Sequence, residues 1–333
     1  MRTISWDKGK ITLLDQTALP NQVRQLEISD YQDLIDAIKR LAVRGAPALG
    51  VAGAFGVALI LKSAEENNWS GEKINAAIAE LRMARPTAVN LAWGVDQMNS
   101  IISEGFAKVL VAAEEIATND ARANRAMGKL GADYLINKCG NRKLRILTHC
   151  NTGALATTEW GTALGVVREL SERGLIEEVL ADETRPLLQG ARLTAWELSE
   201  AKIPYRLLPD SAAASALFAG LVDAVLIGAD RITRNGDTAN KIGSLSVAVA
   251  ATQVQVPFLV VAPESTIDRS LETGADIEIE FRGDAEVTNF GGVSIAPVGT
   301  RTYNPAFDVT PVRYISAIVT EKCVYEMGNG KLL

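Results

Sequence analysis

The second half of the sequence alternates between short apolar runs and longer helical stretches, and this alternation restricts the fold more than any other feature. Five runs after Lys143 read as strands: LRILTH, EEVLAD, YRLLPD, DAVLIGAD and PFLVVAP. Helical stretches separate them at roughly 153–173, 189–201, 211–221 and 241–254. Strands that alternate with helices of this length form right-handed βαβ units, which build a parallel sheet. The pattern therefore predicts an α/β fold with a doubly wound, Rossmann-like parallel sheet.

The first part of the chain follows a different pattern. TISWD and KITLLDQ read as a short strand pair. YQDLIDAIKRLAV carries apolar residues at helical spacing, and further helices are predicted over 73–84, 90–104 and 107–138. We therefore predict two domains. The first, over residues 1–125, is a smaller, mainly helical α+β domain with a short β-sheet, and the second, over 126–333, is a Rossmann-like catalytic domain.

Composition and charge exclude several classes of protein. With 47% apolar and 22% charged residues, the chain can bury a large core. A net charge of −6 and 5% aromatic residues argue against a nucleic-acid partner. The longest apolar run, residues 45–61, contains Pro47 and several glycines and reads as a buried helix rather than a membrane span. Cys139, Cys150 and Cys323 form no CxxC, and the N-terminus has no signal-peptide core, so we expect a cytoplasmic protein.

Each apolar run of the second half ends in polar residues. Because the carboxyl ends of parallel strands line one crevice, where ligands bind, these residues predict one shared site. They are His149, Cys150 and Asn151; Asp182, Glu183, Thr184 and Arg185; Asp210 and Ser211; Asp230 and Arg231; and Glu264, Ser265 and Thr266. Helix capping explains Asp210 and Ser211 equally well. It does not explain Cys150, because cysteine is not a capping residue.

Two of these strand ends carry residues suited to catalysis. Cys150 is predicted where a helix begins, a location that lowers the pKa of a thiol, although a small buried hydrophobe is the alternative. His149 points to the opposite face of its strand, which favours a supporting or packing role over a Cys–His dyad. Asp230 follows a buried strand and suits a general acid. An ion pair with Arg231 or Arg234 would instead make it structural.

Two further stretches are typical of anion sites. RNGDTANKIGSL reads as a turn and then a helix, with Asn240 and Lys241 at or near the helix start. In AVRGAPALG, Arg44 precedes Gly45, whose missing side chain lets a ligand approach the backbone. Arg85 precedes a Pro-Thr pair that can open a helix. Because both arginines fall in the first domain, we expect the ligand between the domains.

Several familiar catalytic motifs are missing from the sequence. It has no P-loop, no HExxH, no G-x-S-x-G and no G-x-G-x-x-G after a strand. A single histidine argues against a zinc site. Asp182, Asp210 and Asp230 can in principle hold Mg²⁺, but nothing in the sequence fixes their geometry. We therefore expect no metal.

Six stretches together resemble the methylthioribose-1-phosphate isomerase family of methionine salvage. They are VRGAPALG, ILTHCNTGALAT, DETRPLLQGARLTAWEL, GADRITRNGDTANKIG, VVAPESTID and NPAFDVTP, which run in order from residue 43 to 311. The wider family includes ribose-1,5-bisphosphate isomerases and regulatory subunits of a eukaryotic initiation-factor guanine-exchange complex. VRGAPALG, THCNTG and QGARLTAWEL resemble the methylthioribose branch most.

The resemblance implies a fold, a reaction and roles for individual residues. It implies a homodimer without a cofactor, in which a small N-terminal domain precedes a Rossmann-like domain. The implied activity is an aldose–ketose isomerase acting on a sugar phosphate, 5-methylthioribose 1-phosphate, with Cys150 as catalytic thiol and Asp230 as proton donor. The residues implied in substrate binding are Arg44, Gly45, Ala46, Arg85, Gln189, Asn240 and Lys241.

Two alternatives follow from the wider family. A ribose-1,5-bisphosphate isomerase needs a second phosphate site in place of an apolar pocket. A regulatory subunit binds a sugar phosphate or nucleotide without turning it over, and the Cys150–Asp230 pair argues against that. Within the isomerase hypothesis, a direct hydride shift and an enol-type proton transfer are both open.

Overall fold

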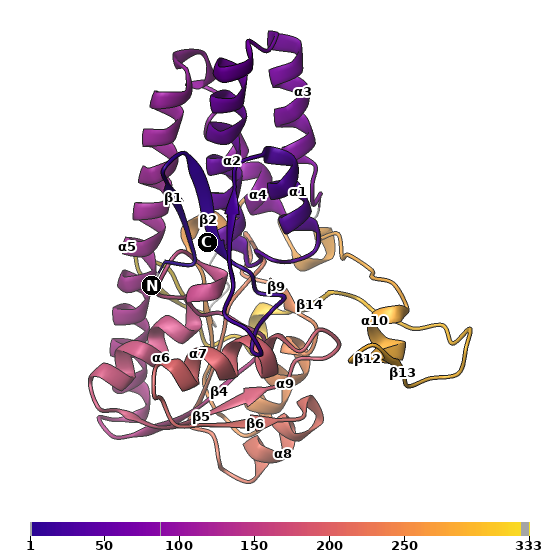
Figure 1. Ribbon diagram of the computed structural model, residues 1–333. Coiled ribbons are helices and arrows are strands. Elements are labelled where there is room, and N and C mark those ends of the chain that lie inside the picture. Colours follow the sequence, from indigo (N-terminus) through magenta and orange to yellow (C-terminus); the bar gives the residue numbers. More distant parts are fainter. Residues whose placement is uncertain (1, 87, 328–332) are drawn as a thin grey trace. The chain divides into compact units, whose positions relative to one another are not determined.

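The computed structural model, shown in Figure 1, describes residues 2–86, 88–327 and 333. The chain divides into two compact units. The first comprises Met1–Ala126 and Thr152–Gly165, and the second comprises Met127–Asn151 and Val166–Leu333. The sequence predicted domains over 1–125 and 126–333, which assigns residues 152–165 to the second domain, whereas in the structure they belong to the first unit. That segment is held in the first unit by hydrogen bonds such as Thr3 Oγ1 to Ala154 O and Gln16 Nε2 to Leu155 O.

The first unit is mainly helical and carries one small sheet. Its strands are β1 (Ile4–Asp7), β2 (Lys10–Leu14) and β3 (Gln25–Ile28), which pair antiparallel in that order. Its helices are α1 (Tyr31–Lys39), α2 (Ala46–Asn67), α3 (Gly71–Arg82), α4 (Val89–Asp96), a short 3₁₀ helix (Ile102–Glu104) and the start of α5 (Phe106–Cys139). The sequence missed β3. The helix expected over 90–104 ends at Asp96, because the following residues form turns with three-residue spacing, such as Ile101 N to Met98 O.

Helix α2 forms the centre of the first unit's core. Among the described residues it is the one helix long and apolar enough to cross a membrane, and 78% of its apolar window is buried inside the protein. Burial to this extent is typical of a core helix. Gly45 caps α2 at φ 95°, and Pro47 lies in its first turn, where proline is tolerated. Thr87, in the Pro-Thr pair before α4, lies outside the described residues.

The second unit is built on a seven-stranded sheet, as the alternating pattern predicted. Its strands lie in the order β16-β15-β10-β7-β4-β5-β6 and are parallel except β16. The five predicted strands are β4 (Leu144–Thr148), β5 (Ile176–Asp182), β6 (Tyr205–Leu208), β7 (Ala224–Ile227) and β10 (Phe258–Val261). The sequence did not predict β15 (Ala317–Val319) and β16 (Val324–Glu326). The doubly wound α/β fold class is confirmed.

The strand order reverses at the middle of this sheet. From β4 the chain moves outward through β5 and β6, and it then returns to add β7, β10 and β15 on the other side of β4. The reversal lies between β4 and β7. In open α/β sheets, the crevice outside the carboxyl ends of two such strands is where ligands bind.

Two of the predicted helical stretches begin later than the sequence indicated. The helices are α6 (Ala163–Glu172), α7 (Ala195–Glu200), α8 (Ala213–Phe218) and α9 (Ser244–Gln253). The stretch predicted as helix from residue 153 is a loop with a short 3₁₀ helix (Ala154–Ala156), and α6 begins only at Ala163. The stretch predicted from 241 begins with a strand. A π-helical turn (Gly190–Thr194) precedes α7, and a 3₁₀ helix (Asp210–Ala212) precedes α8.

A second, smaller sheet and an extended arm complete the second unit. The sheet has the order β11-β8-β9-β14, from β8 (Arg231–Thr233), β9 (Thr238–Lys241), β11 (Ile267–Asp268) and β14 (Phe307–Thr310). Between β11 and β14 the chain extends away from the main sheet as an arm of residues 281–303 (Figure 1). The arm contains α10 (Ala285–Thr288) and the hairpin of β12 (Asn289–Phe290) and β13 (Val293–Ser294). Further 3₁₀ helices span Glu264–Thr266, Gly274–Asp276 and Val312–Tyr314.

Close packing of α4 on α2 yields a stability prediction. A Cβ atom built at Gly94 would lie 1.9 Å from Gly50 O, so G94A forces the two helices apart. Alanine normally stabilises a helix relative to glycine, but we expect G94A to lower the free energy of unfolding by about 1–3 kcal/mol through overpacking. The control is G71A in α3, where a Cβ meets nothing within 4 Å. Denaturant unfolding that shows both variants unchanged would contradict the packing.

Candidate active site

Cys150 and Asp230 follow the two strands between which the sheet order reverses. In the parallel pairing of β4 with β7, Thr148 lies opposite Leu226, and Thr148 Oγ1 donates to Leu226 O at 2.8 Å. Cys150 is two residues beyond Thr148, and Asp230 is four residues beyond Leu226. The structure therefore places both residues at the same edge of the sheet, on neighbouring strand ends. This is the edge at which the sequence predicted a shared site.

Cys150 is held by its backbone, in a conformation that differs from the predicted one. The residue is buried, and its φ of 64° lies in the left-handed region. Its N–H donates to Thr184 Oγ1 at 2.9 Å, and its carbonyl accepts from Thr194 Oγ1 at 2.6 Å. No helix begins at Cys150, so the predicted helix N-terminus beside the thiol is wrong. The residues that follow form a loop of the first unit instead, and Thr3 and Gln16 hold that loop by hydrogen bonds to Ala154 O and Leu155 O.

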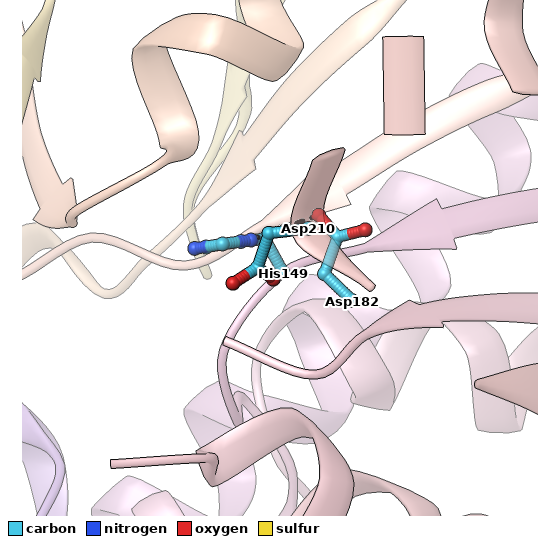
Figure 2. Close-up of side chains that lie close together, drawn as sticks. All are labelled: His149, Asp182 and Asp210. Carbon is cyan, nitrogen blue, oxygen red and sulfur yellow. Dashed lines mark hydrogen bonds and ion pairs between the residues drawn. The ribbon is translucent and has the colours of Figure 1, made fainter. Parts of the chain in front are cut away.

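His149, the neighbour of Cys150, is buried and supports the strand end, as its position on the opposite face predicted. Its Nδ1 lies 2.9 Å from Asp182 Oδ2 (Figure 2). Its Nε2 lies 2.8 Å from the Ile242 carbonyl. Burial by itself lowers the pKa of His149. The hydrogen bond and charge of Asp182, with help from Ile242 and Asp210, outweigh burial and raise that pKa. No sequence motif indicates this pairing, because it depends on how β4 and β5 align in the sheet.

Asp210 approaches the same pair, and the three residues form the group that comes nearest to a metal site in the described part of the chain. One ligand atom from each of His149, Asp182 and Asp210 lies within 4.8 Å of the others. The oxygens of Asp210 accept the backbone N–H groups of Thr184 and Arg185, each at 2.7 Å. His149 uses both nitrogens as described above. These bonds favour a hydrogen-bonded network over a metal centre, and Asp230 is not part of the group.

Asp230 lies at the junction of the two sheets and is half-buried. Its N–H donates to Ala239 O at 2.9 Å, and the pairing of β8 with β9, continued by one residue, places it opposite Asn240. The two arginines that the sequence offered as ion-pair partners contact other carboxylates. Arg231 lies 4.0 Å from Asp268, and Arg234 lies 2.8 Å from Glu272.

Asn240 and Lys241, predicted at or near a helix start, lie on β9, a few residues before the helix. The pairing of β9 with β14 uses their backbones, and α9 begins only at Ser244. Asn240 Nδ2 donates to Ser244 Oγ at 2.8 Å. Lys241 Nζ donates to Ala306 O at 2.9 Å and lies 4.3 Å from the centroid of the Phe307 ring. Both side chains nevertheless come from the strand that pairs with the Asp230 segment.

Gln189 contributes a buried acceptor at the carboxyl side of β5. The residue is 4% exposed, and its Oε1 has no hydrogen-bond partner among the described residues. Buried side-chain oxygens are almost always bonded, so an exception of this kind marks a position where a donor from a ligand would fit. The hydroxyl groups of a sugar are such donors.

The remaining predicted binding residues belong to the first unit. Gly45 caps α2, and a Cβ atom there would lie 2.6 Å from Ala156, in the loop that follows Cys150 in the chain. Arg44 and Ala46 flank it and are half-buried. The first N–H groups of a long helix have no partner within the helix and attract anions. Arg85 is half-buried shortly before α4.

Comparison with known sequences relates the chain to one family. Residues 42–327 match the Initiation factor 2 subunit family. A probable bifunctional methylthioribose-1-phosphate isomerase/methylthioribulose-1-phosphate dehydratase of Nocardia farcinica is 52% identical over 96% of this chain, which spans 58% of that protein. A methylthioribose-1-phosphate isomerase of Acetivibrio thermocellus is 47% identical, over 97% of this chain and 96% of its own. A 5-deoxyribose 1-phosphate isomerase of Moorella thermoacetica is 45% identical, over 99% and 97%.

Solved structures with the same fold include an isomerase and a translation initiation factor subunit. The crystal structure of 5-methylthioribose 1-phosphate isomerase from Pyrococcus horikoshii OT3 superposes with a TM-score of 0.88 at 39% identity, covering 98% of this chain and 92% of that one. The crystal structure of translation initiation factor eIF-2B, subunit delta, from A. fulgidus gives a TM-score of 0.84 at 41% identity, covering 98% and 96%.

The hydrogen bond from Cys150 to Thr184 yields the prediction from this site. T184V keeps the shape of the side chain but leaves the buried N–H of Cys150 without its acceptor, so we expect the free energy of unfolding to fall by about 1–3 kcal/mol. T184S keeps the hydroxyl and loses one methyl group, which costs no more than about 1 kcal/mol. Denaturant unfolding measures both, and equal losses would show that the hydroxyl does not hold Cys150.

Proposed function

Because the chain belongs to the initiation factor 2 subunit family, we propose that it is an aldose–ketose isomerase that converts 5-methylthioribose 1-phosphate to 5-methylthioribulose 1-phosphate in methionine salvage. The observation that carries this proposal is the placement of Cys150 and Asp230 on neighbouring strand ends where the sheet order reverses. A thiol and a carboxyl group at the crevice of an α/β sheet supply a base or charge-stabilising group and a proton donor.

The chemistry of the substrate explains why two such groups are needed. The phosphate at C1 blocks the anomeric oxygen, so the ring does not open to a free aldehyde. Protonation of the ring oxygen by Asp230 opens it. A hydrogen then moves from C2 to C1. In one route the Cys150 thiolate removes the C2 proton and returns it at C1, and in the other the hydrogen shifts as hydride while Cys150 stabilises the charge that develops. In both routes the C2 hydroxyl releases its proton as the ketone forms, which balances the proton that Asp230 gave to the ring oxygen.

Binding residues are assigned by their chemistry. Arg44, Arg85 and Lys241 are cations suited to the phosphate, with the N–H groups at the start of α2 beside Gly45 and Ala46. Asn240 lies opposite Asp230 by strand register, and Gln189 offers its buried Oε1 to a sugar hydroxyl. Binding of the phosphate and hydroxyls orients C1 and C2 relative to the thiol, which lowers the entropic part of the barrier.

Variants of the two proposed catalytic residues test the activity. With 5-methylthioribose 1-phosphate as substrate, we expect C150S and D230N each to lower kcat by about 10²–10⁴-fold. C139S is the matched control, because Cys139 lies at the end of α5, before β4, and its Sγ contacts Asp223 O at 3.7 Å. A coupled assay of ketose formation gives the rates. Near-normal turnover by either C150S or D230N would refute the assignment.

Assays with related compounds separate the alternatives. Ribose 1,5-bisphosphate carries a second phosphate where the proposed substrate carries a methylthio group, and 5-deoxyribose 1-phosphate carries neither. Preference for the bisphosphate would favour the first alternative, and binding without turnover would favour a regulatory subunit. Turnover in deuterated water distinguishes the two routes, because solvent deuterium enters C1 only by proton transfer.

We further propose that the protein is a cytosolic homodimer. The cysteines Cys139, Cys150 and Cys323 are free thiols, which suits a reducing compartment. The arm, residues 281–303, exposes apolar surface that a partner subunit would cover. Its apolar side chains that are half exposed or more are Phe281, Phe290, Val293, Ile295, Val298 and Tyr303.

A charge on the arm tests the dimer. We expect V293D to weaken dimerisation by tenfold or more, because a carboxylate would be buried in an apolar contact. V111D is the matched control, since Val111 is also about 60% exposed (62% against 65%) but lies on α5. Sedimentation equilibrium measures the dissociation constant. A monomeric native protein, or equal effects of the two substitutions, would contradict this arrangement.

A further inference from the structure

His149 is the only histidine of the chain, and both of its ring nitrogens face acceptors. Nε2 lies 2.8 Å from the Ile242 carbonyl, which cannot donate, so Nε2 carries a proton. Nδ1 lies 2.9 Å from Asp182 Oδ2 (Figure 2). A second proton must lie between these two atoms, since two bare acceptors would repel each other at this distance. The His149–Asp182 pair therefore holds two protons.

The groups around the ring decide where the second proton lies. Besides Asp182 at the end of β5, Asp210 comes from the 3₁₀ helix after β6. Asp308 on β14 interacts with the ring through its charge. The two carboxylates that do not contact His149 directly are fixed by backbone N–H groups. Asp210 accepts from Thr184 and Arg185, and Asp308 accepts from Gly243 and Leu245. A positive ring facing three carboxyl groups is favoured over a neutral one.

The surroundings also shift the titration of the ring. Burial lowers the pKa of His149, and the bond and charge of Asp182 more than restore it, so the net direction is upward. Burial likewise raises the pKa of the Asp182 carboxyl, against the effect of His149. Both pKa values are raised, so the pair holds its shared proton more tightly than either group would alone. Because imidazole is intrinsically the more basic partner, Nδ1 is the atom that carries it.

The ring has little room to move. A Cβ atom at Gly243 would lie 2.7 Å from His149 Cε1, so the backbone that follows Ile242 packs directly against the imidazole. A Cβ atom at Gly190 would lie 1.6 Å from Asp182 O, so the turn that follows Gln189 packs equally closely behind Asp182. His149 thus joins three segments of the candidate site: the strand end before Cys150, the end of β5, and the turn after Lys241.

We propose that His149 is a permanently protonated positioning residue, an imidazolium that Asp182 and the Ile242 carbonyl hold between the strand end carrying Cys150 and the turn following Lys241. Its charge makes both hydrogen bonds charge-assisted, roughly twice as strong as neutral ones. The three segments are thereby kept in register while substrate binds. The kinetic consequence of this proposal rests on the proposed function, whereas the protonation state does not.

The protonation state is measured directly, because a single histidine gives unambiguous signals. In the full-length native protein labelled with ¹⁵N-histidine, we expect both ring nitrogens to carry protons from about pH 5.5 to about pH 8.5, a range that brackets the ordinary histidine pKa of ~6.5. A ring that titrates within this range, or an Nδ1 without a proton at neutral pH, overturns the proposal. This measurement needs no substrate and no turnover.

D182N tests the role of the charge in positioning. The introduced amide can donate to Nδ1, so both ring contacts persist but the ring becomes neutral. We expect kcat/KM to fall by at least about tenfold, and a displacement of about 1 Å in the site would cost about a hundredfold. The value of kcat/KM should recover in part when the pH is lowered, because the ring is then protonated. The same labelling should show that Nδ1 has lost its proton at neutral pH.

D223N is the matched control. The Asp223 carboxylate is also buried and pairs with Arg142 and Arg145. It lies just before β7, at the amino end of that strand, whereas the candidate site lies at the carboxyl ends. Its loss should lower stability while the pH profile of kcat/KM keeps the native shape. If D182N matches the native enzyme in rate and profile, the proposal is wrong. If the native enzyme turns over none of the sugar phosphates, the proposed function fails, and the protonation measurement still decides the state of His149.

Discussion

The parallel pairing of β4 with β7 is the constraint on which the candidate site depends. These two strands lie side by side at the centre of the sheet, yet the chain leaves them in opposite directions, toward β5 on one side and β10 on the other. The connections therefore diverge and leave the carboxyl ends of both strands accessible. Cys150 and Asp230, eighty residues apart in sequence, come to one edge because of that register. No local feature of either motif brings them together.

Buried polar contacts then fix the geometry of this edge. The hydroxyls of Thr184 and Thr194 hold both backbone groups of Cys150, and Asp210 holds the backbone of Thr184 in turn. Each contact satisfies a buried group that would otherwise cost roughly 1–3 kcal/mol. Two buried side-chain oxygens at the end of β5, Asp182 Oδ1 and Gln189 Oε1, have no hydrogen-bond partner among the described residues. Hydroxyl groups of a ligand would supply the missing donors.

Much of the fold followed from the sequence, because strand and helix periodicity are local properties. All five predicted strands of the main sheet exist, and α2 is buried as its glycines and proline indicated. The failures fall where long-range hydrogen bonds override local preference. Residues 153–162 read as helix, yet their backbone bonds to Thr3 and Gln16 in the first unit. Residues 238–241 read as the end of a turn and the start of a helix, but pairing with β8 and β14 makes them a strand.

The order and type of the residues are enough to establish the fold class, the polar residues at the strand ends and the family resemblance from which the candidate residues were assigned. The tertiary structure alone decided the partners. That His149 binds Asp182 and Ile242, that Thr184 holds Cys150 and that Asp230 faces the β9 strand all depend on which strands are neighbours and in what register. The physical reason is range: periodicity acts within a few residues, whereas these hydrogen bonds join segments separated by tens of residues and form only once the sheet has assembled.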